Sequence, residues 1–165
     1  MNKPFIFVLL FISIIFSSNA QVMNQRETFL VSTNILKLAY AVPNIEVEYY
    51  ILNSVSAQLC SEYVLGHWVI KSENHPDLVS RLGFRYHVLH AKEQGAKNDP
   101  YFGIYGGYSW SKDYPTHTTP NLGIDFGYKY QFNDCIFINA KGLVTYKLND
   151  SKVLPGIECL LGYVF

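Results

Sequence analysis

The chain has 165 residues, which is room for one domain of ordinary size. Its 13 basic and 13 acidic residues balance, so it lacks the basic excess that a nucleic-acid-binding face requires. Charged residues make up only 16% of the chain, against about 25% in soluble domains, and aromatic residues make up another 16%. Three cysteines are too few, and odd in number, for a disulfide scaffold.

The first 20 residues predict a secretory signal peptide. Lys3 gives a positive start, and an unbroken apolar run extends from Phe5 to Phe16. Small side chains then precede Gln21 at the positions that signal peptidase requires. The run is too short for a membrane-spanning helix, which needs about 20 residues. We therefore expect residues 1–20 to be removed and residues 21–165 to form one domain.

The mature chain opens on a segment whose structure the pattern leaves open. From Thr28 to Ala39 two apolar faces compete and neither prevails, so the segment stays unassigned. From Asn44 to Ile51 apolar and polar residues alternate, which is the period of a half-buried strand. The segment from Val55 to Leu65 continues this alternation less cleanly.

The middle of the chain carries the clearest strand patterns. The segments Leu78 to Val88 and Tyr101 to Ser111 alternate apolar residues with polar residues or glycine. From Asn121 to Phe132 every second residue is a large apolar one. A helix would scatter these residues around its circumference, whereas a strand places them on one face.

Two more strands are predicted near the C-terminus. One runs from Ile136 to Tyr146, with Phe137 and Leu143 interrupting its polar side, and the other from Gly156 to Phe165. With the opening segment the count is eight, and tight connections alternate with long polar ones, apart from the connection from His90 to Asp99, which is long where a tight one is expected. The sequence therefore predicts an all-β fold, an eight-stranded antiparallel up-and-down barrel.

The same alternation suits a soluble barrel with its apolar face inward and a membrane barrel with that face toward lipid. Seven of the nine strand glycines fall on the polar face, and small residues suit the crowded lumen of an eight-stranded membrane barrel. The charges on that face nearly balance, as a poorly hydrated lumen requires, although solvent-facing charges are the simpler alternative. We predict a lumen network made of Glu46, Glu48, Glu62, Arg81, Arg85, Asp125, Lys129, Lys141 and Glu158.

Aromatic residues gather near both sets of predicted strand ends. One group comprises Phe102, Tyr130, Phe132, Tyr163 and Phe165, and the other Trp68, Tyr108, Trp110 and Tyr146. Two belts of aromatic rings are typical of membrane barrels, although these residues are also good strand formers. The pattern favours a transmembrane barrel.

The last strand resembles the C-terminal strand of bacterial outer-membrane proteins. The resemblance rests on Ile157, Leu161, Tyr163 and the terminal Phe165. It implies recognition by the barrel-assembly machinery and a location in the bacterial outer membrane. The plan of the chain resembles the small OmpA/OmpX-like barrels, and the stretches at 33–36, 43–48 and 154–158 look similar to uncharacterised Bacteroidetes-type barrels. We expect a monomer surrounded by outer-membrane lipid.

No catalytic, cofactor or metal site is recognisable. None of the five histidines has a serine two residues later, as the lipid A deacylase type of barrel has, and no Gly-x-Ser-x-Gly or HExxH motif occurs. Glu46 and Glu48 lie side by side as paired glycosidase carboxylates can, but the bases opposite account for them more simply. His87 is expected to belong to the same network. The three cysteines, Cys60, Cys135 and Cys159, are expected to be small apolar fillers.

The leading hypothesis is a non-enzymatic outer-membrane barrel with a structural or surface-interaction role. Its loops at 66–77, 112–119 and 149–153 would contact the outside. Two alternatives remain open: a small pore, and a soluble exported carrier with a lipocalin-like barrel.

Overall fold

The computed structural model describes residues 29–52, 54–64, 77–88, 98–111, 118–149 and 151–165. The predicted signal peptide, Trp68 and most of the two loops predicted at 66–77 and 112–119 lie outside these ranges. The described elements are β1 (Phe29–Asn34), α2 (Ile35–Ala39), β2 (Asn44–Leu52), β3 (Val55–Tyr63), β4 (Leu78–His87), β5 (Asn98–Trp110), β6 (Thr119–Gln131), β7 (Ile136–Lys147) and β8 (Lys152–Val164). No helix among them is long and apolar enough to cross a membrane.

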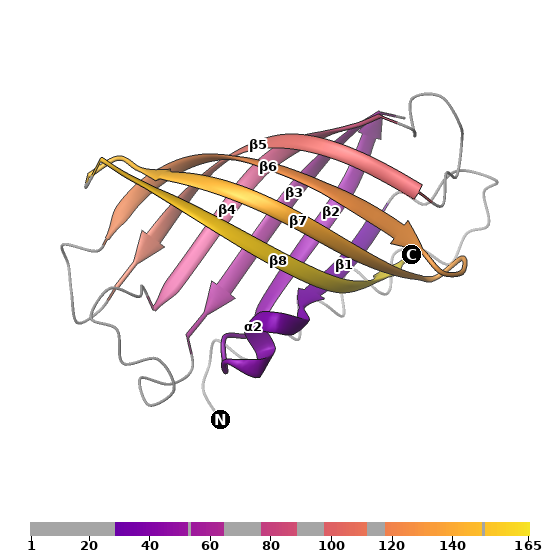
Figure 1. Ribbon diagram of the computed structural model, residues 1–165, viewed down its shortest axis with the longest axis horizontal. Helices are drawn as coiled ribbons and strands as arrows, with labels where there is room; N and C mark the ends of the chain where they lie inside the picture. Colours follow the sequence, from indigo (N-terminus) through magenta and orange to yellow (C-terminus); the bar gives the residue numbers. More distant parts are fainter. Residues whose placement is uncertain (1–28, 53, 65–76, 89–97, 112–117, 150) are drawn as a thin grey trace.

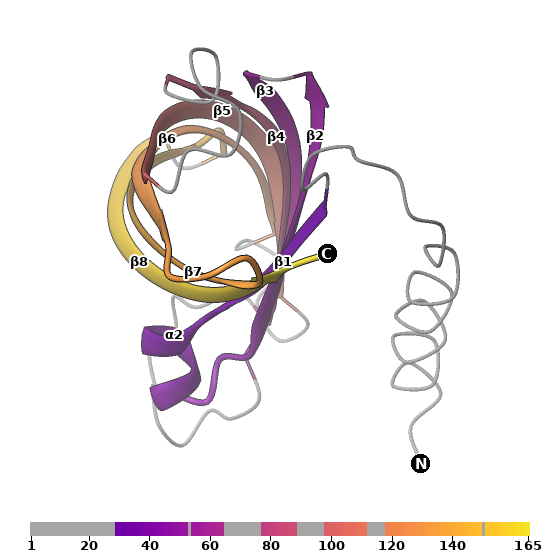
Figure 2. The same ribbon diagram turned by 90° about the vertical axis from the view of Figure 1, so that its right-hand side faces the viewer.

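The eight strands close into an antiparallel up-and-down barrel, which confirms the predicted fold class (Figures 1 and 2). Each strand pairs with its neighbours in sequence, and β8 returns to pair with β1. Following paired residues once around the barrel from Gly162 leads back to β8 at Lys152, ten residues away. Such a stagger tilts the strands by about 35–45° from the barrel axis.

The two ends of the barrel differ. One end, which we call the turn end, carries the start of β1, the end of β8 and the β2–β3, β4–β5 and β6–β7 connections. The opposite end, the loop end, carries α2 and the β3–β4, β5–β6 and β7–β8 connections. In outer-membrane barrels short turns face the periplasm and longer loops face outward, so we expect the loop end to be the outer side, although the β4–β5 connection at the turn end, residues 88–97, is also long.

The faces of the barrel are arranged as in a membrane protein. Large apolar side chains that point outward stay exposed, including Leu82, Ile104, Leu122 and Ile157. Side chains that point inward are mostly polar and buried, including Ser56, Gln58 and Asn139. A lipocalin-like carrier needs the opposite arrangement, with its apolar faces lining a cavity.

Aromatic rings form belts at both ends of the outer wall. At the turn end the rings of Tyr163 and Phe165 lie 4.8 Å apart, and Phe29 lies 6.0 Å from Phe165. At the loop end Tyr108 and Trp110 of β5 are exposed. These belts suit the two interfaces of a bilayer, where rings with one polar edge are most stable.

The unassigned opening segment contains both a strand and a helix, so neither apolar face continues throughout. In β1 the side chains of Leu30, Ser32 and Asn34 point inward. Asn34 then ends the strand, because its side-chain oxygen accepts hydrogen bonds from the backbone N–H groups of Leu36 and Lys37 and caps α2. The change from period 2 to a helical turn explains why the pattern was ambiguous.

Inward glycines make room for aromatic rings of the neighbouring strand. The Tyr101 ring lies over Gly127, where an added Cβ would come within 2.6 Å of the ring carbon Cζ. Tyr105 covers Gly123, and Phe137 covers Gly162, in the same way. The predicted crowding of the lumen therefore has a specific form: a ring on one strand replaces the side chain missing from the next.

Candidate functional site

All nine predicted network residues point into the lumen, and none is more than 9% exposed. They come from six strands: Glu46 and Glu48 from β2, Glu62 from β3, Arg81 and Arg85 from β4, Asp125 and Lys129 from β6, Lys141 from β7, and Glu158 from β8. Alternation along each strand sets which residues face inward. Closure of the barrel then sets which charges meet.

Arg85 is the centre of the network. Its guanidinium donates from Nη1 to Glu46 at 2.7 Å and to Glu48 at 3.0 Å, and from Nη2 to Asp125 at 2.7 Å. The same group lies 4.5 Å from the centre of the Tyr101 ring. A planar guanidinium with several donors can serve three carboxylates at once, which an ammonium group does less well.

Lys141 connects this centre to a second cluster nearer the loop end. Its ammonium group lies 2.5 Å from Glu46 and 3.0 Å from Glu158. Arg81 in turn pairs with Glu62 and lies 3.0 Å from Glu158. The carboxylates of three strands are thereby neutralised across the barrel, which offsets the free-energy cost of burying them.

Lys37 of α2 completes the second cluster and was missed by the sequence reading. Its ammonium group lies 2.7 Å from Glu62 and 2.6 Å from Glu158, and its side chain is 27% exposed. No strand pattern identifies this residue, because it lies in the one helix of the described chain. Its position depends on the capped turn at Asn34.

A third cluster lies toward the turn end and adds residues that were not predicted. His87 Nδ1 lies 2.6 Å from Asp99, and its Nε2 lies 2.9 Å from Glu48. Tyr50 donates to Asp99 at 3.2 Å and accepts from Lys129 at 3.0 Å. His87 was expected in the network, but Asp99 precedes a proline and was taken as part of a connection. Its strand position appears only in the pairing of β5 with β6.

Ser56, His87 and Asp99 lie in the order of a hydrolase triad, with Ser56 Oγ 2.8 Å from His87 Nε2. However, the Ser56 hydroxyl also donates to the Glu48 carboxylate at 2.8 Å, and Ser56 and His87 are completely buried. A nucleophile must reach a substrate carbonyl, and this serine has no exposed surface from which to do so. The arrangement is therefore better suited to binding charge inside the lumen than to catalysis.

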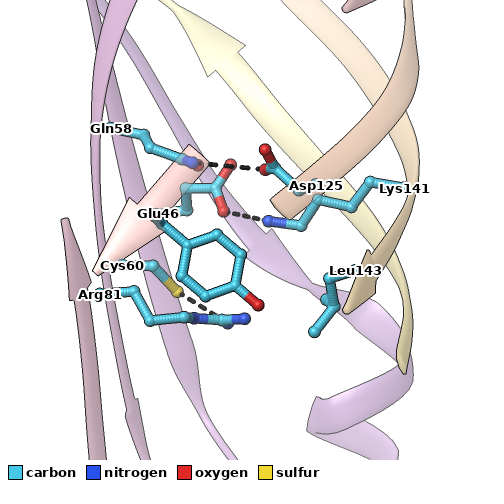
Figure 3. Close-up of a pocket in the computed structure, with 8 residues that line it drawn as sticks. Glu46, Gln58, Cys60, Arg81, Asp125, Lys141 and Leu143 are labelled. Atoms are coloured by element: carbon cyan, nitrogen blue, oxygen red, sulfur yellow. Dashed lines mark hydrogen bonds and ion pairs between the residues drawn. The ribbon is translucent and has the colours of Figure 1, made fainter. Parts of the chain in front are cut away.

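Figure 3 shows part of this network around a small cavity of the lumen, with Glu46 and Lys141 joined by an ion pair. The cavity between Glu46, Gln58, Arg81, Asp125 and Lys141 has a volume of about 10 Å³, enough for one water molecule. Gln58 donates to Asp125 at 3.3 Å across this space, and Cys60 lies 3.4 Å from an Arg81 nitrogen. Cys60 is buried, as a filler residue would be, but it contacts a charged side chain.

The residues predicted as an assembly signal lie on the outer face of β8. Ile157, Leu161, Tyr163 and Phe165 are all exposed. The backbone N–H of Phe165 donates to the carbonyl of Phe29 at 2.9 Å, so the last residue still pairs with β1. Recognition of these four residues by the barrel-assembly machinery stays a prediction.

Within the described ranges no group of three or more histidine, cysteine or carboxylate side chains is placed to hold a metal ion. The cysteines Cys60, Cys135 and Cys159 are free thiols.

The comparisons with known proteins agree with this architecture. A family described as "Protein of unknown function (DUF3575)" matches residues 5–135. The chain belongs to this family. No protein with a curated description matches the sequence.

Two solved structures share the fold. One is the N-terminal β-barrel domain of Pseudomonas aeruginosa OprF, with 16% identity and a TM-score of 0.60 over 85% of this chain and 98% of that one. The other is Neisserial surface protein A (NspA), with 14% identity and a TM-score of 0.52 over 84% of this chain and 96% of that one. The protein thus has the fold of the small eight-stranded outer-membrane barrels, and the resemblance to that class is confirmed.

Proposed function

We propose that this protein is a non-enzymatic barrel of the bacterial outer membrane, closed to solutes, that serves the envelope or the cell surface through its loop end. The observation that carries the proposal is the combination of an apolar outer wall with a lumen filled by paired charges. An apolar wall is stable only in lipid, and paired charges leave no continuous water path.

Three features support this function over an enzyme or a soluble carrier. Six carboxylates in the lumen face five lysine and arginine cations, and His87 lies between two of those carboxylates. The serine nearest to a triad is bonded to Glu48 and buried. The fold is shared with NspA, whose name describes a surface protein.

The proposal is tested first by comparing boiled and unboiled protein from the detergent-extracted membrane fraction. We expect the unboiled protein to migrate faster in electrophoresis, because a closed barrel resists the detergent. Protein found instead in the soluble periplasmic fraction, without a heat-dependent shift, would contradict the membrane location.

Planar bilayer recordings then test the closed lumen. We expect the purified protein to produce no stepwise conductance, because the cavity at the centre holds about 10 Å³. Regular current steps from the unaltered protein would support a small pore instead. Loss of an acyl chain from lipid A on expression would support an enzyme.

A further inference from the structure

Among the described residues, the pairing that closes the barrel between β8 and β1 does not extend to the loop end. β1 pairs with β8 only from Leu160 to Val164, so the edge of β8 from Lys152 to Cys159 has no strand beside it among the described residues (Figure 1). At about 3.3 Å per residue, this open edge is on the order of 25 Å long. We call it the notch.

The notch lies at a depth that a membrane barrel would place in the outer leaflet. Tyr146 of the loop-end aromatic belt pairs with Val153, and Ile157 lies four residues farther toward the turn end. Unpaired backbone is costly in hydrocarbon unless it faces protein, water or a polar ligand. Pro155 lies in this stretch, and proline is tolerated where a sheet edge needs no N–H donor.

The helix α2 lies to one side of the ring of strands, next to β8, and covers only part of the notch (Figure 2). Lys37 reaches inward from α2 to Glu158. The outward side chains of α2 are apolar, with Leu36 and Leu38 almost half exposed. The helix therefore provides an apolar border to the notch and a cation within it.

Behind the notch lies a cavity of about 240 Å³, which we call the vestibule, on the loop-end side of the charge network. Its polar lining includes the cations Lys37, Arg81 and Lys147, the carboxylates Glu62 and Glu158, and the amide of Asn121. Ile157 also lines it, although this side chain is on the outer wall and is 82% exposed. A residue of the outer wall contributes to a lumen cavity only where the wall is open.

A second depression, of about 690 Å³, follows the outer wall from the same place. It is lined by Phe126, Gly142, Val144, Pro155 and Ile157. Leu143, Gly156 and Ile157 line both this groove and the vestibule, so a polar space and an apolar groove adjoin at the notch. Adjoining polar and apolar spaces suit a molecule with a polar head and a hydrocarbon tail.

The charged residues of the vestibule determine which kind of polar head group it can bind. Lys37 and Arg81 are paired with Glu62 and Glu158, but Lys147 has no carboxylate partner among the described residues. Lys147 faces Lys152 directly across the β7–β8 pair, and like charges in that position repel. An anionic group would relieve the repulsion between the two lysines.

We propose that the notch binds an anionic lipid of the surrounding outer leaflet. The phosphate-bearing head lies in the vestibule near Lys147, with Lys152 next to Lys147 across the β7–β8 pair, and an acyl chain lies in the groove along Pro155 and Ile157. The lipid head thereby covers the open edge of β8 with groups that can hydrogen-bond to it.

The test measures lipid retention by native mass spectrometry, using the full mature chain in a neutral detergent. The probes are phosphatidic acid, phosphatidylcholine with the same chains, and inorganic phosphate. We expect phosphatidic acid to be retained at least about tenfold more strongly than phosphatidylcholine, since charge-assisted contacts differ by about that factor. Inorganic phosphate alone should not be retained, because it lacks the chain.

Two variants, each with its own control, separate the contribution of the lipid head from that of the acyl chain. The double variant Lys147→Gln, Lys152→Gln should lose the preference for phosphatidic acid, and Lys147→Arg, Lys152→Arg should keep it. Ile157→Trp should obstruct the junction of vestibule and groove and lower retention of phosphatidic acid about tenfold. Leu82→Trp, at an equally outward position on β4, should leave retention unchanged. The faster unboiled band shows that each variant is folded.

Several results would overturn the proposal. Equal retention of the two lipids would mean that the lysines do not recognise the head. An equal loss in the Leu82→Trp variant would mean that the lipid is an unspecific annular one. Retention of inorganic phosphate as strong as that of phosphatidic acid would reduce the site to a free-anion pocket.

Discussion

Arg85 contacts three buried carboxylates, those of Glu46, Glu48 and Asp125. Among the described residues, no lysine of the network contacts more than two. The Arg85 side chain is completely buried. Removing Arg85 would leave Glu46 and Glu48 with one lysine each, Lys141 and Lys129, and would leave the buried Asp125 with no cation among the described residues. The cost is therefore expected to exceed that of losing a surface ion pair.

We predict that Arg85→Met lowers the free energy of unfolding by about 3–5 kcal/mol. Urea titration in detergent, followed by loss of the faster unboiled band, measures this change. Lys37→Met is the matched control, because Lys37 is partly exposed and shares its two carboxylates with Arg81. Equal stability of the Arg85→Met variant and the unaltered protein would show that the network is hydrated and does not depend on this residue.

The inward glycines allow a second prediction at the residue scale. Gly127→Ala places a methyl group against the Tyr101 ring and is expected to cost about 1–3 kcal/mol through overpacking. Gly106→Ala is the control, because Gly106 points outward and its nearest neighbour, a Leu122 methyl carbon, lies 3.6 Å from the new Cβ. Equal urea midpoints for the two variants would contradict the ring-over-glycine packing.

At the scale of elements, the junction of β1 and α2 depends on Asn34. Its side-chain oxygen caps the helix, and its backbone N–H donates to the Asn44 side chain at 2.5 Å. One residue thus ends a strand, starts a helix and connects β1 to the beginning of β2. Through this turn it positions Lys37 at the mouth of the lumen.

We predict that Asn34→Ala removes about 1 kcal/mol of local stability and releases α2. Amide hydrogen exchange at Leu36 and Lys37 should become faster, while exchange in β5 and β6 stays unchanged. Asn133→Ala is the matched control, because Asn133 accepts from Cys135 and Ile136 in a turn at the other end. Faster exchange at α2 in that control would mean that the effect is global rather than a lost cap.

At the scale of the whole molecule, closure of the barrel depends on the short pairing between β1 and β8. Phe165 is the last residue of this seam, where it donates its backbone N–H to Phe29 and packs against Tyr163. It is also the terminal aromatic of the predicted assembly signal. Stability and assembly in the cell can therefore be separated at this residue.

We predict that deleting Phe165 reduces the amount of folded barrel in the outer membrane several-fold, whereas refolding of the purified protein into detergent stays efficient. Both quantities are measured from the unboiled gel band. Phe132→Ala is the control, because Phe132 is similarly exposed at the same end of the barrel. If both variants fell equally in cells, the effect would belong to the aromatic belt rather than to the C-terminal signal.

The alternation of side chains determined much of this architecture in advance. A strand with period 2 separates its faces whatever its neighbours are, so the inward position of all nine network residues followed from the sequence. The positions of Asp99 and Lys37 in the network could not be predicted from this alternation, for two physical reasons. A proline beside Asp99 indicated a connection, and the helical turn that holds Lys37 interrupts the strand period.

The sequence by itself determined which side chains face lipid and which face the lumen, because that choice is local and repeats every two residues. Which charge meets which was decided only by the tertiary structure, since the stagger of eight strands brings Glu46, Arg85, Asp125 and Lys141 together from four separate segments. The tertiary structure also decided that the notch exists and where it lies. A strand edge is open or closed according to how far its partner extends, and no pattern within β8 records where β1 ends.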